Sequence, residues 1–206
     1  ILIQNASTVG SLDLKIINSS KENNFKFFDT LENNEVSFLY LLGSDNLKIN
    51  KNNEFIVYQG SHGDRGAEIA DVILPSGAYT EQNGLYINLE GRVQECRKAS
   101  YLPGIAKEDW RIFNLILEKL NKKVIYKNHL SIRKDVFELI PNFSDIDLLP
   151  KKDFKKSDKN KTNFFEESIN IKKIDYYFTN SIARSSKTMA ECRRIKNQEL
   201  KDGTFN

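Results

Sequence analysis

Three glycines spaced three residues apart, Gly60, Gly63 and Gly66, stand where this sequence could bind a phosphate group. They follow an apolar run typical of a buried strand and precede a short helical stretch. At such a position an α/β sheet can hold a phosphate on free backbone N–H groups. The G-x-x-G-x-x-G spacing differs, however, from the G-x-G-x-x-G of dinucleotide-binding turns. A phosphate site and a tight turn without a ligand both stay open, and the spacing favours the second.

A histidine and an aspartate within this turn, His62 and Asp64, could act as a general base and the carboxylate that orients it. No nucleophile is evident beside them, and the one other histidine, His129, lies far along the chain. A hydrogen bond that stabilises the turn is therefore the favoured role of His62.

A second group of charged residues surrounds an extended segment: Glu81, Glu90 and Arg92, with Gly84 and Gly91 between them. They could form an acid pair with an arginine clamp. Charged side chains beside glycines more often tie a loop to neighbouring elements through hydrogen bonds. From spacing alone, the sequence supports no more than an α/β domain with an ordered polar loop.

The two cysteines, Cys96 and Cys192, lie far apart and form no C-x-x-C pair. Iron-sulfur clusters and structural zinc sites usually need four ligands. We therefore expect two free thiols and no metal site in this chain.

Composition narrows the class of protein. The 206 residues are 39% hydrophobic, which allows one core of ordinary domain size with some sequence left over. Because 31 basic residues nearly balance 28 acidic ones, a stand-alone nucleic-acid binder is a weak interpretation. No apolar run approaches the ~20 residues of a membrane span, so we expect a soluble or peripheral protein. The first residues show neither a secretory nor a transit pattern. Because the sequence opens without Met, we expect its true start to lie upstream.

The elements that must position these residues follow from apolar runs and turn formers. Residues 37–42, 54–59 and 71–74 are short apolar runs, each ended by glycine or proline, a pattern typical of strands buried on both faces. A helical stretch at 64–70 separates the last two. This order predicts a parallel α/β sheet. Residues 85–88 and 92–95 are predicted to be extended pieces outside the main sheet.

Helices are predicted at 5–14, with Asn5 as its cap, at 107–119 and at 131–139. The apolar stripe of the second comprises Trp110, Ile112, Phe113, Ile116, Leu117 and Leu120. Residues 151–161 are almost all charged or amide side chains, which predicts a solvated linker. Helical spacing returns at 181–196, with Ile182, Met189, Cys192 and Ile195 as candidate buried positions.

Beyond these patterns, residues 55–75 (FIVYQGSHGDRGAEIADVILP), continued by 78–81 (AYTE) and 86–94 (YINLEGRVQ), closely resemble the large iron-sulfur subunits of mitochondrial and bacterial complex I. The resemblance extends to 4–7 (QNAS), 12–14 (LDL), 41–45 (LLGSD), 103–111 (PGIAKEDWR) and the tail at 177–192 (YFTNSIARSSKTMAEC). Only 25–36 and 151–168 lack a clear counterpart.

The resemblance implies a domain derived from molybdopterin oxidoreductases, whose signatures recur at 70–75 and 90–94, with the cofactor lost. It implies an α/β fold with a partial doubly wound, mainly parallel sheet. We expect a molybdopterin-oxidoreductase-like domain at 1–125, a helical extension at 126–150, a charged linker at 151–168 and a docking tail at 169–206. The resemblance also implies that this chain has no catalytic and no cofactor-binding residue. Interface candidates are Trp110, Glu90, Arg92, Ile182, Met189 and Cys192.

Two functions remain open. The first is a non-catalytic structural part of complex I, supporting electron transfer from NADH to ubiquinone. Its expected partners are the N-terminal iron-sulfur half as a separate chain and other peripheral-arm subunits, which would carry the clusters and FMN. Together with a composition rich in Lys, Asn, Ile and Phe, this implies an organelle-encoded protein on the matrix side of the inner mitochondrial membrane. The second is a fragment of an active molybdopterin-dependent oxidoreductase, such as a formate dehydrogenase.

Overall fold

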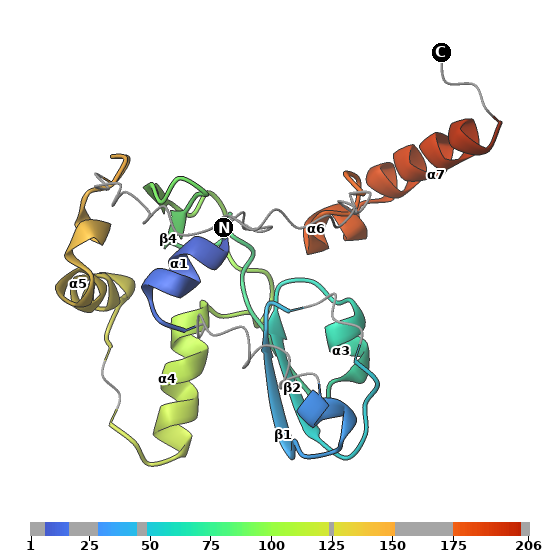
Figure 1. Cartoon of the computed structure of the whole chain (residues 1–206). Coiled ribbons are helices and arrows are strands. Elements are labelled where there is room, and N and C mark those ends of the chain that lie inside the picture. Colours follow the sequence, from blue (N-terminus) through green and yellow to red (C-terminus); the bar gives the residue numbers. More distant parts are fainter. Residues whose placement is uncertain (1–6, 17–28, 45–48, 124–125, 151–174, 203–206) are drawn as a thin grey trace, which may run out of the picture. The chain divides into compact units, whose positions relative to one another are not determined.

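The computed structural model describes residues 7–16, 29–44, 49–123, 126–150 and 175–202 (Figure 1). It divides the chain into two units, Ile1–Pro150 and Lys151–Asn206. The predicted linker at 151–168 and the predicted cap Asn5 lie outside the described residues. No helix among the described residues combines the length and the apolar character that crossing a bilayer requires.

A three-stranded parallel sheet lies in the first unit, with strands β1 (Phe38–Leu42), β2 (Phe55–Gly60) and β3 (Val72–Pro75) side by side in sequence order. The three predicted strands and their parallel direction are confirmed. The described strands show no reversal of order, so the doubly wound part of the expectation stays a prediction.

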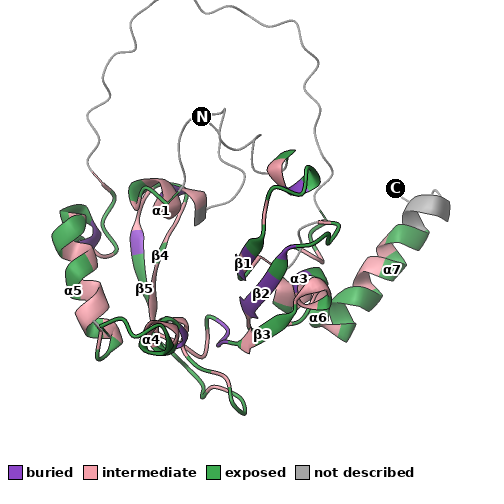
Figure 2. Cartoon of the chain, turned by 90° about the horizontal axis from the view of Figure 1, so that it is seen from below, coloured by how far each residue is buried: buried purple, intermediate pink, exposed green. Residues whose placement is uncertain are grey.

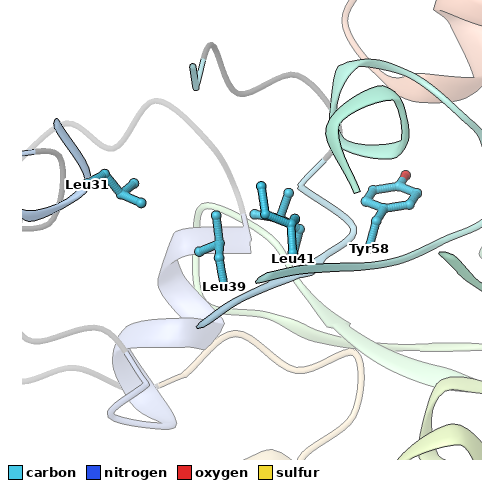
Figure 3. Packing of buried hydrophobic residues seen from close by; sticks show 5 residues of the cluster. Leu31, Leu39, Leu41 and Tyr58 are labelled. Carbon is cyan, nitrogen blue, oxygen red and sulfur yellow. The ribbon is translucent and has the colours of Figure 1, made fainter. Parts of the chain in front are cut away.

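One side of this sheet is covered by helix α3 (Arg65–Ile69) and by the helical turn at 29–32 (Figure 1). Alternate side chains of β1 and β2 point to this side and form the core, with Ile56 fully buried (Figure 3). The cluster comprises Leu31, Leu39, Leu41, Ile56 and Tyr58. Small residues of α3, such as Ala67, let the helix pack closely on these side chains.

The opposite side of the sheet meets helix α4 (Asp109–Lys119), whose Phe113 ring stacks on Tyr40 with 5.8 Å between centroids. Much of this side is not covered by the residues that the structure describes. Its exposed apolar side chains are Phe38 (56% exposed), Leu42 (50%), Phe55 (48%) and Val72 (38%). We call these four residues, with Phe113, the α4-side patch.

The expectation that every strand is buried on both faces is therefore correct only for β2, the middle strand (Figure 2). β1 buries Leu39 and Leu41 but exposes the alternate residues, and β3 is largely exposed. The physical reason is position, since β1 and β3 are the edges of the described sheet and α4 covers only part of one face.

A second, two-stranded antiparallel sheet joins β4 (Gly84–Ile87) to β5 (Val93–Cys96), and it confirms the two predicted extended pieces. Gly91 closes the connecting turn with a φ of +83°, a left-handed conformation that glycine adopts without strain. The N–H of Gly91 donates to the Asn88 carbonyl at 3.0 Å, and the N–H of Asn88 donates to the Arg92 carbonyl at 3.1 Å. This is the hydrogen-bond pattern of a three-residue hairpin loop.

Helices α1 (Ser7–Asp13) and α5 (His129–Leu139) complete the first unit, with a 3-10 turn at Pro141–Ser144 that the sequence patterns did not predict. The second unit contains α6 (Ser181–Ser185) and α7 (Lys187–Asp202). The continuous helix expected at 181–196 is interrupted because Ser186 adopts an extended conformation, and its hydroxyl accepts a hydrogen bond from the N–H of Met189.

Candidate functional site

The glycine turn after β2 is filled by a side chain of the protein itself. A Cβ on Gly60 would overlap the Tyr58 ring, and a Cβ on Gly66 would lie 2.8 Å from the Ser44 carbonyl oxygen and 2.9 Å from the same ring. The Tyr58 hydroxyl donates to the His62 carbonyl at 2.7 Å, which holds the ring across the turn. These glycines make room for Tyr58, so the turn does not fit a phosphate cradle of the kind that opens a long helix.

His62 and Asp64 take local roles in this turn. The Nδ1 of His62 lies 2.9 Å from the Ser61 hydroxyl, and an Asp64 carboxylate oxygen accepts from the N–H of Arg65 at 2.8 Å, which caps α3. Since α3 has only five residues, its N-terminus offers little helix dipole to an anion. The turn-stabilising interpretation fits this geometry better than a catalytic pair.

A partly buried polar network joins the sheet to α4, and sequence patterns missed it. Gln59 is fully buried, and its Nε2 donates to an Asp109 carboxylate oxygen at 2.6 Å. The other Asp109 oxygen accepts from Gln82 Nε2 at 3.0 Å, and the Tyr40 hydroxyl donates to the Gln59 side-chain carbonyl. Burial, and then the nearby Asp109 carboxylate, raise the pKa of Tyr40. The available signal was the single amide within the otherwise apolar run of β2.

The charged residues around the hairpin tie their own loops and form no acid pair. A Glu81 carboxylate oxygen accepts from the N–H of Ala78 at 2.9 Å. The Asn88 side-chain oxygen accepts from the N–H groups of Glu90 and Arg92, each at 3.0 Å. Glu90 and Arg92 make a loose ion pair at 3.7 Å. Buried Arg92 Nε has no hydrogen-bond partner among the described residues.

A cavity of about 750 Å³ lies between the hairpin and helices α1, α4 and α5. Trp110, half-buried on α4, lines it, with its indole N–H donating to Glu108 at 2.6 Å. One wall is closed by the ion pair of Arg133 and Glu95 at 2.7 Å, and the hydrogen bond from Arg133 lowers the pKa of Glu95. The lining is mostly apolar, and its principal side chains include Leu14, Leu85, Tyr86, Ile87, Ile132, Val136 and Phe143.

The apolar stripe predicted for α4 is buried only in part. Only Ile112 is buried, whereas Phe113 is 39% exposed and Leu120 is 61% exposed. The apolar stripe of this helix is therefore covered only in part by the rest of the first unit.

The tail candidates lie on the surface of the second unit. Ile182 is 37% exposed and Met189 is 38% exposed, while Cys192 is half-buried. The segment before α6 packs back on α7 instead, since the Arg193 guanidinium lies 4.6 Å from the centre of the Phe178 ring. That Ile182, Met189 and Cys192 pack against other protein surfaces stays a prediction.

Within the described part of the chain, no three His, Cys, Asp or Glu side chains are grouped so that they could hold a metal ion. Cys96 and Cys192 are both free thiols.

Comparison with known proteins gives two family matches. The model of the molybdopterin oxidoreductase family matches residues 1–119, and the model of the C-terminal region of the NADH-ubiquinone oxidoreductase G-type subunit matches residues 141–192. The two matches lie in succession along one chain.

Individual relatives carry names of the same kind. The NADH-ubiquinone oxidoreductase 75 kDa subunit of Reclinomonas americana is 41% identical over 200 residues, 95% of this chain and 28% of that protein. The mitochondrial 78 kDa subunit of Candida albicans is 40% identical over 93% of this chain and 27% of its own length. The G-type subunit of the NADH-quinone oxidoreductase of Rickettsia conorii is 39% identical over 95% of this chain and 28% of its own. The chain thus spans between a quarter and a third of the curated relatives that it matches.

Proposed function

This chain belongs to the molybdopterin oxidoreductase family, and from this premise we propose that it is a non-catalytic structural part of the large iron-sulfur subunit of respiratory complex I. In this role it supports electron transfer from NADH to ubiquinone by packing against the cluster-bearing part of the subunit and against neighbouring subunits. The match of residues 141–192 to an NADH-ubiquinone oxidoreductase family model, and the names of the relatives, support this choice within the family.

The observation that carries the packing role is the uncovered α4-side patch. Phe38 and Phe55 stack on one another with 6.3 Å between centroids, yet each remains about half exposed. Scattered apolar residues are normal on a protein surface, but a contiguous cluster across adjacent strands marks an interaction site. Covering it with protein would release the water held against these rings.

We also propose that the chain holds no redox centre and that the iron-sulfur clusters and FMN of the complex lie on partner chains. Two cysteines are fewer than the four ligands that a cluster usually takes. At the turn where a molybdopterin enzyme could bind nucleotide phosphate, the Tyr58 ring packs against Gly60 and Gly66. The same geometry weighs against an active molybdopterin-dependent oxidoreductase.

For location and partner, we propose that this chain is organelle-encoded and lies in the matrix-side arm of the mitochondrial complex, with the cluster-bearing half supplied as a separate chain. The relatives from Candida albicans and Neurospora crassa are mitochondrial by name. The composition, rich in Lys, Asn, Ile and Phe, suits an AT-rich organellar gene.

Affinity purification of the tagged full chain from mild-detergent extracts of its own cells tests the proposal. Complex I subunits, NADH:ubiquinone activity and iron should accompany the chain. The Phe55→Asp variant should lose these partners, because it places a charge in the α4-side patch. Asn53→Asp, which adds the same charge two residues away at an exposed position, serves as the matched control. A chain that purifies without complex I subunits contradicts the proposal.

A further inference from the structure

The large cavity of the first unit runs along one edge of the β4–β5 hairpin. Every residue from 82 to 88 lines it, whereas β5 contributes only Gln94 and Glu95. Successive side chains of a strand point to opposite faces of its sheet. A cavity confined to one face would be lined by alternate residues, so contact with every residue shows that this cavity also reaches around the free edge of β4.

The register of the hairpin shows which backbone groups face that edge. Asn88 and Arg92 form the hydrogen-bonded pair next to the turn, and bonded and non-bonded pairs alternate along an antiparallel ladder. Tyr86 and Gln94 are then a bonded pair, while the Ile87–Val93 and Leu85–Glu95 pairs direct their N–H and C=O groups outward.

A hydrogen bond on the opposite edge supports this assignment. The Val93 carbonyl, which the register directs outward from β5, accepts from the N–H of Asp147 at 2.7 Å. The free edge of β5 is thus partly covered by the chain that follows α5. On the β4 edge, the outward groups of Leu85 and Ile87 have no backbone or side-chain hydrogen-bond partner among the residues that the structure describes.

We propose that this cavity is a docking groove for an extended polypeptide segment of another chain, which adds as a third strand along β4. Its backbone pairs with the outward groups of Leu85 and Ile87. Its alternate apolar side chains enter the cavity and pack against Trp110 and Phe143. The inference deepens the proposed function and rests on it for the statement that the partner is another chain of the same assembly.

The unpaired backbone groups of β4 favour a peptide over a small apolar molecule as the occupant of the cavity. The cavity volume of about 750 Å³ suits either occupant. An apolar small molecule would leave the N–H and C=O groups of Leu85 and Ile87 covered and unsatisfied, which is unfavourable. An added strand satisfies them, in the way that extended peptides bind exposed sheet edges. The cavity also stays accessible beside Tyr86, which is 48% exposed.

Hydrogen–deuterium exchange resolved to single residues tests this in the purified assembly and in the isolated full chain. The Tyr86 amide faces Gln94 and should be protected in both states. The Leu85 and Ile87 amides face outward and should exchange at least tenfold more slowly in the assembly than in the isolated chain. A photo-reactive phenylalanine at Tyr86 should cross-link to a peptide of a second chain.

The outcomes separate this inference from the proposed function. If complex I subunits accompany the chain but both outward amides exchange as they do in the isolated chain, the docking inference alone is overturned. Slow exchange without any cross-linked peptide would indicate a small-molecule ligand and would also overturn it. If no complex I subunit accompanies the chain, the proposed function fails, and the inference fails with it.

A pair of variants tests whether the backbone of β4 contributes to binding of the partner segment. Leu85→Pro removes one outward N–H without removing a hydrogen bond of the β4–β5 ladder, and Leu85→Val keeps it. The proline variant should lower recovery of the cross-linked partner at least severalfold, and the valine variant should not. Equal recovery with both would contradict strand addition. Protection of the Tyr86 amide in the isolated proline variant reports that its hairpin has folded.

Discussion

The side-chain amide of Gln59 donates a 2.6 Å hydrogen bond to Asp109, linking the middle strand of the sheet to the first turn of α4. The two residues are 50 positions apart in sequence. This contact, together with the Tyr40–Phe113 stacking, attaches α4 to the sheet.

Removing the acceptor should destabilise the first unit. Asp109→Ala leaves the buried Gln59 amide without its carboxylate partner, which we expect to cost about 1–3 kcal/mol of unfolding free energy. Asp109→Asn keeps one oxygen acceptor and should cost less. Urea unfolding of the full chain measures both values, and equal midpoints for wild type and the alanine variant would show that the network contributes no stability.

The stability of the sheet should depend on pH through Asp71. Its carboxylate accepts from the N–H of Ile56 and then from Lys51, and these hydrogen bonds lower the pKa of Asp71. A carboxyl group whose pKa is lower in the folded chain adds stability above its unfolded pKa of about 4, and this is lost as pH falls. Asp71→Asn should therefore be less stable than wild type at pH 7, and the difference should shrink towards pH 3. A constant difference in urea midpoint across that range would exclude this linkage.

The glycines of the turn should differ in how well they tolerate substitution by alanine. Gly66→Ala would bring a Cβ within 2.8 Å of the Ser44 backbone oxygen, so we expect a loss of about 1–3 kcal/mol despite the better helix propensity of alanine. Gly63→Ala meets only the Ala67 methyl at 3.8 Å and should leave stability nearly unchanged. Thermal unfolding of the full chain measures both effects.

Neither variant nor wild type should bind guanine nucleotides, and isothermal titration measures this binding. Saturable micromolar binding that a bulky residue at Gly63 abolishes would instead support a retained nucleotide site.

Trp110 should matter for assembly and not for redox chemistry. Because Trp110 is only half-buried, Trp110→Ala should cost less than the ~3–5 kcal/mol typical of a fully buried tryptophan. It should still lower the yield of assembled complex, since it removes an apolar wall of the cavity. Trp110→Phe, which keeps an aromatic ring there, is the control. Native electrophoresis measures the yield of the complex, and electron paramagnetic resonance measures the potentials of its clusters. Shifted cluster potentials at a normal yield would contradict this role.

The tail should remain bound after the chain is cut. Trypsin cleaves after lysine, and lysines are concentrated at 151–161, a stretch outside the described residues. In the intact assembly the released terminal fragment should stay bound through Ile182, Met189 and Cys192. Met189→Lys should loosen it, whereas Thr188→Lys, at an exposed neighbouring position, should not. Quantitative mass spectrometry of the washed assembly measures retention. Complete loss of the wild-type fragment would mean that the tail is only an appendage.

Local patterns in the sequence were enough to predict the strands of the parallel sheet, the two extended pieces at 85–88 and 92–95, and the main helices. Apolar runs ended by Gly43, Gly60 and Pro75 specify strand positions, because turn formers interrupt strand geometry whatever surrounds them. Gly91 likewise separates the two extended pieces, but their antiparallel pairing was not predicted. The break at Ser186 was missed, since helical spacing alone does not show where a serine hydroxyl will cap a new helix.

Only the tertiary structure decided which side chains are covered and which backbone groups have no partner among the described residues. Phe38 and Leu39 are adjacent and equally apolar, yet one is 56% exposed and the other 7%, because α3 and the turn at 29–32 pack on one side of the sheet. Likewise, the cavity beside β4 is lined by residues of α1, α4 and α5, which are distant from the hairpin in sequence. Such contacts depend on how whole elements pack, and the periodicity of a single element carries no information about its neighbours.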